Sequence, residues 1–182
     1  MNSKDLKQKI LEAKKETGTI VLAHTYQEPD IIDIADITGD SFFLSKKAAE
    51  IKAKRVIMCG VRFMAETVKI FSPEKTVYLS SPDAGCPMAE QLSVEELAEL
   101  KKQYPDHAVV AYVNTTSALK TLCDVCVTSS SAVQILRRME EKKILTAEAS
   151  QEFSESLCDI LGENYNLQVC YSGLAVKGLL EE

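Results

Sequence analysis

The sequence has no tryptophan, few aromatic residues, few glycines and prolines, and no long apolar run. A helix needs roughly 20 apolar residues to cross a bilayer, so the absence of such a run predicts no membrane partner. The scarcity of glycine and proline excludes collagen-like and low-complexity chains. What is left is the composition of a soluble globular protein. Its 182 residues fit one large domain or two small ones.

The sequence also lacks a block of charge of one sign. The formal net charge is −6, and basic residues are mixed with acidic ones, as in KKAAEIKAKR at 46–55 and LRRMEEKK at 136–143. Nucleic-acid binding requires a basic surface, so the sequence predicts no nucleic-acid partner. The first 15 residues read as a charged amphipathic helix without the apolar core of a signal peptide. We therefore expect a cytoplasmic protein.

The sequence contains six cysteines. In a reducing compartment they are mostly buried apolar groups, and less often metal ligands or nucleophiles. A CxxC pair at 123–126 alone would indicate zinc or redox chemistry. Because no second pair follows, buried thiols are favoured there, and packing roles are expected for three other cysteines in predicted strands or helices. The six are Cys59, Cys86, Cys123, Cys126, Cys158 and Cys170.

An internal repeat of 88 residues organises the sequence. Adding 88 to a number in the first half reaches a chemically similar residue in the second. The segment VLA at 21–23 falls on VVA at 109–111, and Asp36 falls on Asp124. We therefore predict two tandem domains, 1–91 and 92–182, the second diverging after about residue 140.

Each repeat alternates helical and strand patterns. The predicted strands are apolar and β-branched, which is typical of strands buried on both faces of a parallel sheet. The fold class predicted is α/β, with two tandem three-layer αβα domains, short parallel sheets and internal duplication. Expected helices are 6–15, 41–54, 62–71, 94–103, 129–141 and 151–162; expected strands include 21–23, 55–60, 76–80, 109–111, 142–147 and 167–172.

Polar side chains follow the first strand of each repeat, where ligands bind in open α/β sheets. His24 is one of two histidines, and its pKa near neutrality suits a proton carrier, although a histidine at the end of a strand can equally be structural. Tyr26 lies two residues on, on the same side of an extended chain. Tyr112 and Asn114 repeat this spacing, whereas His107 is expected to be solvated.

Two serines and one cysteine complete the candidate set. Ser41 and Ser129 each precede a helical pattern, so they could bind an anion together with free backbone N–H groups, or act only as N-caps. The sequence leaves both readings open. Cys86 lies between a glycine and a proline in the loop SPDAGCPMAEQL, 81–92, where a thiol could be a nucleophile or a soft-metal ligand.

Five motifs in order resemble the quinolinate synthase family, the iron–sulfur enzymes of NAD biosynthesis, over about residues 3–138. They are VLAHTYQ, DIADITGDS, GVRFMAETVKI, DAGCPMAE and VVAYVNTTSALKTLCDVCVTSSSAV. The resemblance implies αβα domains around a central site, where iminoaspartate condenses with dihydroxyacetone phosphate to form quinolinate. It also implies a 4Fe-4S cluster held by three cysteines, one from each of three domains, with one iron open as a Lewis acid.

The resemblance implies a role for each candidate. Cys86 would be the metal ligand of the first domain, and His24 and Tyr26 would be catalytic. The residues that would contact the small anionic substrates are His24, Tyr26, Ser41, Tyr112, Asn114 and Ser129.

The sequence departs from the family where the second repeat should mirror Cys86, because Leu174 stands near that place. Only two of the three domains have counterparts, so two cluster ligands are missing. One hypothesis is an enzyme whose site is completed by another copy in a homo-oligomer or by a separate third-domain chain. The alternatives are a non-catalytic relative that binds small anions or regulates, and a truncated product.

Overall fold

The computed structural model describes residues 3–147, 157, 159, 161–162, 165–171 and 174–176. The chain divides into two compact units, unit 1 (Met1–Cys86) and unit 2 (Pro87–Glu182), and each contains its own sheet. The sequence-based boundary after residue 91 lies a few residues further along. Across the described residues, we find no helix with the length and apolar character that a membrane span requires.

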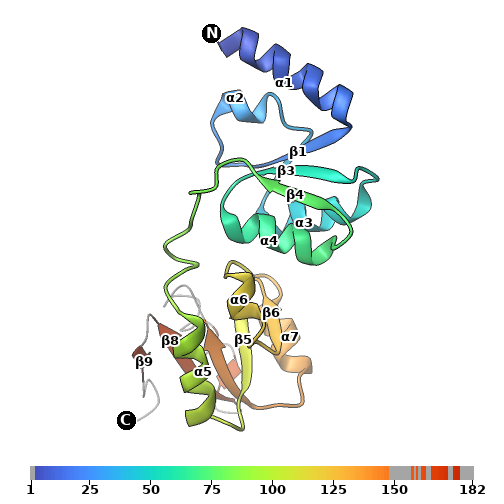
Figure 1. The fold of residues 1–182 in the computed structure, drawn as a ribbon. Coiled ribbons are helices and arrows are strands. Elements are labelled where there is room, and N and C mark those ends of the chain that lie inside the picture. The colour runs from blue at the N-terminus through green and yellow to red at the C-terminus, as the bar shows by residue number, and fades with distance from the viewer. Residues whose placement is uncertain are drawn as a thin grey trace. The chain divides into compact units, whose positions relative to one another are not determined.

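In unit 1 the strands are parallel and have the order β2-β1-β3-β4. Figure 1 shows α1 and α2 on one side of this sheet and α3 and α4 on the other, which confirms the predicted three layers. The elements are α1 (Ser3–Thr17), β1 (Thr19–His24), α2 (Pro29–Ile32), β2 (Ile37–Gly39), α3 (Ser41–Glu50), β3 (Arg55–Cys59), α4 (Arg62–Phe71) and β4 (Thr76–Leu79).

Unit 2 repeats the order as β6-β5-β7-β8, all parallel, and adds β9 antiparallel to β8. The antiparallel strand contains Leu174 and has no counterpart in the described part of unit 1, so the repeat diverges in structure as well as in sequence. The described elements are α5 (Val94–Gln103), β5 (Ala108–Tyr112), α6 (Ser117–Lys120), β6 (Val125–Val127), α7 (Ala132–Arg138), β7 (Lys143–Ala147), β8 (Asn166–Tyr171) and β9 (Leu174–Val176).

Alternate residues of the unit 2 strands supply two cores, one on each face of the sheet. Ile144 packs with Leu136 of α7 on one face. Leu145 packs with Leu97 of α5 and Leu119 of α6 on the other. Burial on both faces explains why these strands read as continuous apolar runs rather than alternating ones.

The duplication extends to individual hydrogen bonds. The Val21 amide donates to Asp36 Oδ2 at 2.7 Å, and the Val109 amide donates to Asp124 Oδ2 at 2.7 Å. In return, the amide of each aspartate donates to the carbonyl of that valine at 2.8 Å. Asp36 and Asp124 therefore hold the start of the short strands β2 and β6 against the central strand of each sheet.

Replacing Asp124 by alanine is expected to lower the free energy of unfolding by about 1.5 kcal/mol, because the Val109 amide loses a charged acceptor. Chemical denaturation followed by circular dichroism measures the change. Asp106→Ala is the matched control, because its carboxylate is 75% exposed and pairs with Lys143 at 3.6 Å. It should cost less than about 0.5 kcal/mol. Equal costs for the two variants would contradict the role of Asp124.

The first helix of each unit is buried to a different extent. Leu97 and Leu100 of α5 are buried, and a capping box between Ser93 and Glu96 fixes the start of that helix. Helix α1 contains no buried residue and is held by ion pairs, among them Lys14 to Asp36 at 3.0 Å. The sheet of unit 1 is consequently less well covered on the α1 side than its counterpart in unit 2.

Candidate functional site

The predicted residues of unit 1 gather at the carboxyl edge of its sheet, the end where β1, β2 and β3 finish. His24 ends β1 and is in register with Gly39, which ends β2. Asp40 and Ser41 follow at the start of α3. The parallel pairing of β1 with β2 therefore brings His24 beside the Gly39-Asp40-Ser41 segment, although His24 and this segment are not neighbours in the sequence.

Cys86 is positioned at the same edge by its loop. The Arg62 amide, at the start of α4, donates to the Ala84 carbonyl at 2.8 Å. The Arg62 guanidinium donates to the Pro82 carbonyl at 2.7 Å. Since α4 begins just after β3 ends, these bonds hold the loop that leads to the half-buried Cys86 near the carboxyl edge of unit 1.

His24 and Tyr26 are in contact, but through a turn and not along an extended strand as expected. The Gln27 amide donates to the His24 carbonyl at 3.0 Å, which closes the turn. The Tyr26 amide donates to His24 Nδ1 at 3.3 Å, and the two rings meet edge to face with centroids 4.7 Å apart. Tyr26 is 91% exposed, so its hydroxyl is accessible to a ligand.

Burial lowers the pKa of His24 below its usual value, and the nearby charge of Asp40 opposes this effect. Asp40 was not among the predicted site residues. The sequence does contain a feature that could have identified it: Asp40 directly precedes an apolar helical pattern, and aspartate is a preferred N-cap residue.

The expectation that Ser41 could cap α3 is wrong. Asp40 is the N-cap, and its carboxylate accepts from the Phe43 amide at 2.8 Å, so Ser41 is the first residue of the helix. A carboxylate one residue earlier reaches the free amides of the first turn better than the serine can. The preceding Gly39 is also explained, because a Cβ there would lie 2.2 Å from Cδ1 of Phe43.

The cap expected from Ser129 is wrong for a similar reason. Helix α7 begins at Ala132, after a turn in which the Thr128 amide donates to Ser131 Oγ at 2.9 Å. Ser129 is exposed within this turn, and its hydroxyl lies 3.1 Å from that of Tyr112, which ends β5. The structure thus brings two predicted residues of unit 2 together as a pair of hydroxyls.

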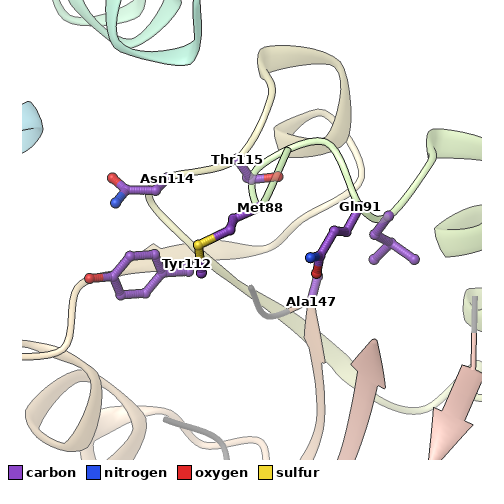
Figure 2. Close-up of a pocket in the computed structure, with 7 residues that line it drawn as sticks. Met88, Gln91, Tyr112, Asn114, Thr115 and Ala147 are labelled. Carbon is purple, nitrogen blue, oxygen red and sulfur yellow. The ribbon is translucent and has the colours of Figure 1, made fainter. Parts of the chain in front are cut away.

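Asn114 and Tyr112 line a small pocket at the carboxyl edge of unit 2. Figure 2 shows the amide of Asn114 and the hydroxyl of Tyr112 pointing to the same side. The cavity measures about 10 Å³, room for about one water molecule, so a substrate would not be enclosed by this pocket alone. It is lined by Met88, Gln91, Leu92, Tyr112, Asn114, Thr115 and Ala147.

The two cysteines of the CxxC pair are half-buried and pack against a core, so the fully buried thiols that the sequence favoured are found only in part. Cys123 and Cys126 both contact the core that contains Leu145. Burial raises the pKa of Cys123 to about 12 and also raises that of Cys126, which leaves both thiols protonated and poorly nucleophilic at neutral pH. Cys59 is buried in β3, and Cys158 lies outside the described residues.

His107 is half-buried, contrary to the expectation that it is solvated. Both of its ring nitrogens are buried and have no hydrogen-bond partner among the residues that the structure describes, and its ring lies against Tyr104. Burial, with the charge of Lys143, lowers the pKa of His107 against the opposing effect of Asp106.

Protonation of the two histidines is expected to destabilise the fold. Because burial lowers the pKa of His24 and His107, the unfolded chain takes up protons that the folded chain does not. The free energy of unfolding should fall as the pH drops below about 6.5 and level off below the folded pKa values. Denaturation at several pH values between 7.5 and 5 measures this. His107→Gln should flatten the decline, and an unchanged slope would rule His107 out as a cause.

A 4Fe-4S cluster does not fit the donors that the structure describes. Such a cluster requires several cysteine thiolates. Across the described ranges, no group of three histidine, cysteine, aspartate or glutamate side chains is placed to hold a metal ion. Cys86 could supply one ligand only. The remaining ligands would have to come from outside the described residues.

Sequence comparison decides the family. Residues 8–151 match the sequence profile described as quinolinate synthetase A protein. The chain belongs to the quinolinate synthetase A family. Among relatives named quinolinate synthase, those of Clostridium perfringens strain SM101 and Clostridioides difficile strain 630 are each 50% identical, over 141 and 142 residues. The Aquifex aeolicus relative is 44% identical over 142 residues.

These family matches cover the chain and its relatives unequally. Each includes 78% of this chain, but only 47% of the two clostridial relatives and 44% of the Aquifex one. The chain thus spans about half the length of the curated relatives that it matches.

Proposed function

We propose that this chain forms part of a cytoplasmic quinolinate synthase that condenses iminoaspartate with dihydroxyacetone phosphate in NAD biosynthesis. The observation that carries the proposal is the duplicated carboxyl edge, where each unit presents polar side chains that match the family motifs. Unit 1 presents His24, Tyr26 and Cys86, and unit 2 presents Tyr112 and Ser129.

In unit 2, the hydroxyls of Tyr112 and Ser129 are proposed to bind an anionic group of a substrate. They lie 3.1 Å apart and are not buried, so both can turn toward a phosphate or carboxylate oxygen. Hydrogen bonds to ionised groups are stronger than neutral ones, which favours this exchange of partners. The Asn114 amide, on the same side of the pocket, would add a further polar contact.

In unit 1, His24 and Tyr26 are proposed to contact the reacting atoms, and Ser41 a substrate anion. Ser41 is the first residue of the ten-residue helix α3, whose N-terminal dipole favours negative charge, as the Asp40 carboxylate on the Phe43 amide already shows. Cys86 is proposed to provide one cluster ligand. Another copy of the chain or a separate chain would provide the others.

Reconstitution with a fragment of a relative tests this function. The chain is purified anaerobically alone and together with the part of the Clostridium perfringens relative that lies beyond the match. The mixture should contain bound iron and sulfide. It should also form quinolinate from dihydroxyacetone phosphate and iminoaspartate that is generated in situ. Cys86→Ser should remove both properties, whereas Cys59→Ala, at a buried thiol in β3, should retain them. Iron-free, inactive protein in every mixture would overturn the proposal.

A second candidate function is non-catalytic binding of a small anion. Two observations favour it. The hydroxyl and imidazole groups that could bind an anion are retained. The described residues, however, offer too few metal ligands for a cluster. Calorimetric titration of the chain alone with dihydroxyacetone phosphate distinguishes the candidates when combined with reconstitution. Saturable binding without activity in any mixture supports the second function, and activity in the mixture supports the first.

A further inference from the structure

The His24 ring is held by contacts within its own turn. The Tyr26 amide donates to Nδ1 at 3.3 Å, and the Tyr26 ring packs against the imidazole with centroids 4.7 Å apart. A third contact, from the Gln27 amide to the His24 carbonyl at 3.0 Å, fixes the backbone between them. These contacts within residues 24–27 therefore orient the imidazole.

The acceptor role of Nδ1 determines where the neutral ring carries its proton. A backbone amide can only donate, so the Nδ1 atom that faces it must offer a lone pair. In a neutral imidazole the other nitrogen is then protonated, and this assignment follows from the hydrogen bond. We propose that His24 presents Nε2–H at the carboxyl edge of unit 1 as a hydrogen-bond donor to a ligand oxygen, with the Tyr26 backbone amide as its positioning group.

This role differs from that of a proton carrier. To accept a proton at Nε2, the neutral ring must first carry its proton on Nδ1, and to donate a proton as an acid it must be protonated at both nitrogens. Either state places an N–H on Nδ1 against the Tyr26 N–H and breaks their hydrogen bond. Burial also lowers the pKa of His24, which favours the neutral ring at neutral pH despite the charge of Asp40.

A fixed Nε2–H selects ligands by their acceptor atoms. It fits a carbonyl, carboxylate or phosphate oxygen, and it disfavours an ammonium group, which can only donate. For the proposed substrates, on which this step rests, His24 would orient and polarise an oxygen while the proton stays on the ring. No bond to hydrogen is formed or broken by His24.

Nitrogen-15 NMR of the histidines tests the assignment without any enzymatic activity. The chain has two histidines, so the His24→Gln variant identifies the His24 signals by their loss. Long-range proton–nitrogen spectra of the intact chain at pH 8 should show His24 as a neutral ring protonated on Nε2. A ring protonated on Nδ1, a charged ring, or a fast mixture of the two neutral forms would overturn the proposal.

Binding of dihydroxyacetone phosphate gives a second readout. His24→Gln retains a donor at similar reach, and His24→Leu has a similar size without one. The glutamine variant should bind within about threefold of the wild type, and the leucine variant about tenfold more weakly or worse. Equal losses would overturn the donor role. If the wild type binds no dihydroxyacetone phosphate although NMR shows Nε2–H, the proposed function fails and the tautomer assignment stands.

Discussion

Replacing Leu145 by alanine is expected to lower the free energy of unfolding of unit 2 by about 3 kcal/mol. Leu145 is fully buried in the core formed with Leu97 and Leu119, so truncation leaves a cavity. Ile57 occupies the equivalent position in unit 1 but is only half-buried, because α1 does not cover the sheet as α5 does. Ile57→Ala should therefore cost about half as much or less.

Chemical denaturation followed by circular dichroism and tyrosine fluorescence measures both variants, since the chain has no tryptophan. Leu11→Ala is a control for the loss of an apolar side chain that is 37% exposed, and it should cost less than about 1 kcal/mol. Similar losses for Leu145→Ala and Ile57→Ala would mean that the two sheets are equally covered, contrary to the structure.

Removing either hydroxyl of the Tyr112–Ser129 pair in unit 2 is expected to weaken ligand binding strongly. Ser129→Ala and Tyr112→Phe should each weaken binding of dihydroxyacetone phosphate about tenfold, because each removes one donor to an ionised oxygen. Their effects should not add fully, since the two hydroxyls share a hydrogen bond at 3.1 Å in the free protein. Isothermal titration calorimetry of the single and double variants measures the affinities and the coupling.

Tyr104→Phe is the matched control for this binding experiment. Tyr104 belongs to the same unit but precedes β5, at the opposite end from Tyr112, and contacts His107. Its loss of a hydroxyl should leave the affinity within about twofold. A comparable loss in Tyr104→Phe and Tyr112→Phe would show that the carboxyl edge is not the binding site.

The long elements could be predicted because their signals are local. Helix α5 extends over Val94–Gln103 as expected, since its capping box defines the start within a few residues of sequence. The strands β1 and β5 were recognised as continuous apolar runs, and the structure buries their middle residues on both faces. The fold class follows from this alternation.

The short elements depend on contacts that a local pattern does not contain. Strands β2 and β6 have three residues each and start next to Asp36 and Asp124, whose carboxylates bond to a strand 15 residues earlier. Helix α3 ends at Glu50, before the expected position, because Ile51 is extended.

The same distinction applies to the candidate site. His24 and Tyr112 were found because each ends a recognisable strand. Three residues near the carboxyl edges of the sheets were missed because none of them ends a strand. They are Asp40, the N-cap of α3, and the loop residues Met88 and Gln91. The contact between Tyr112 and Ser129 was also missed, because it depends on the turn before α7.

Binding of small anions at the carboxyl edges of the two sheets is tested most directly by amide NMR during titration with dihydroxyacetone phosphate. Saturable shifts are expected at 24–27 and 39–41 in unit 1, and at 112–115 and 128–131 in unit 2. Shifts confined to the opposite ends of the strands, around Lys54 and Arg55 or His107, would contradict it, as would the absence of any saturable shift.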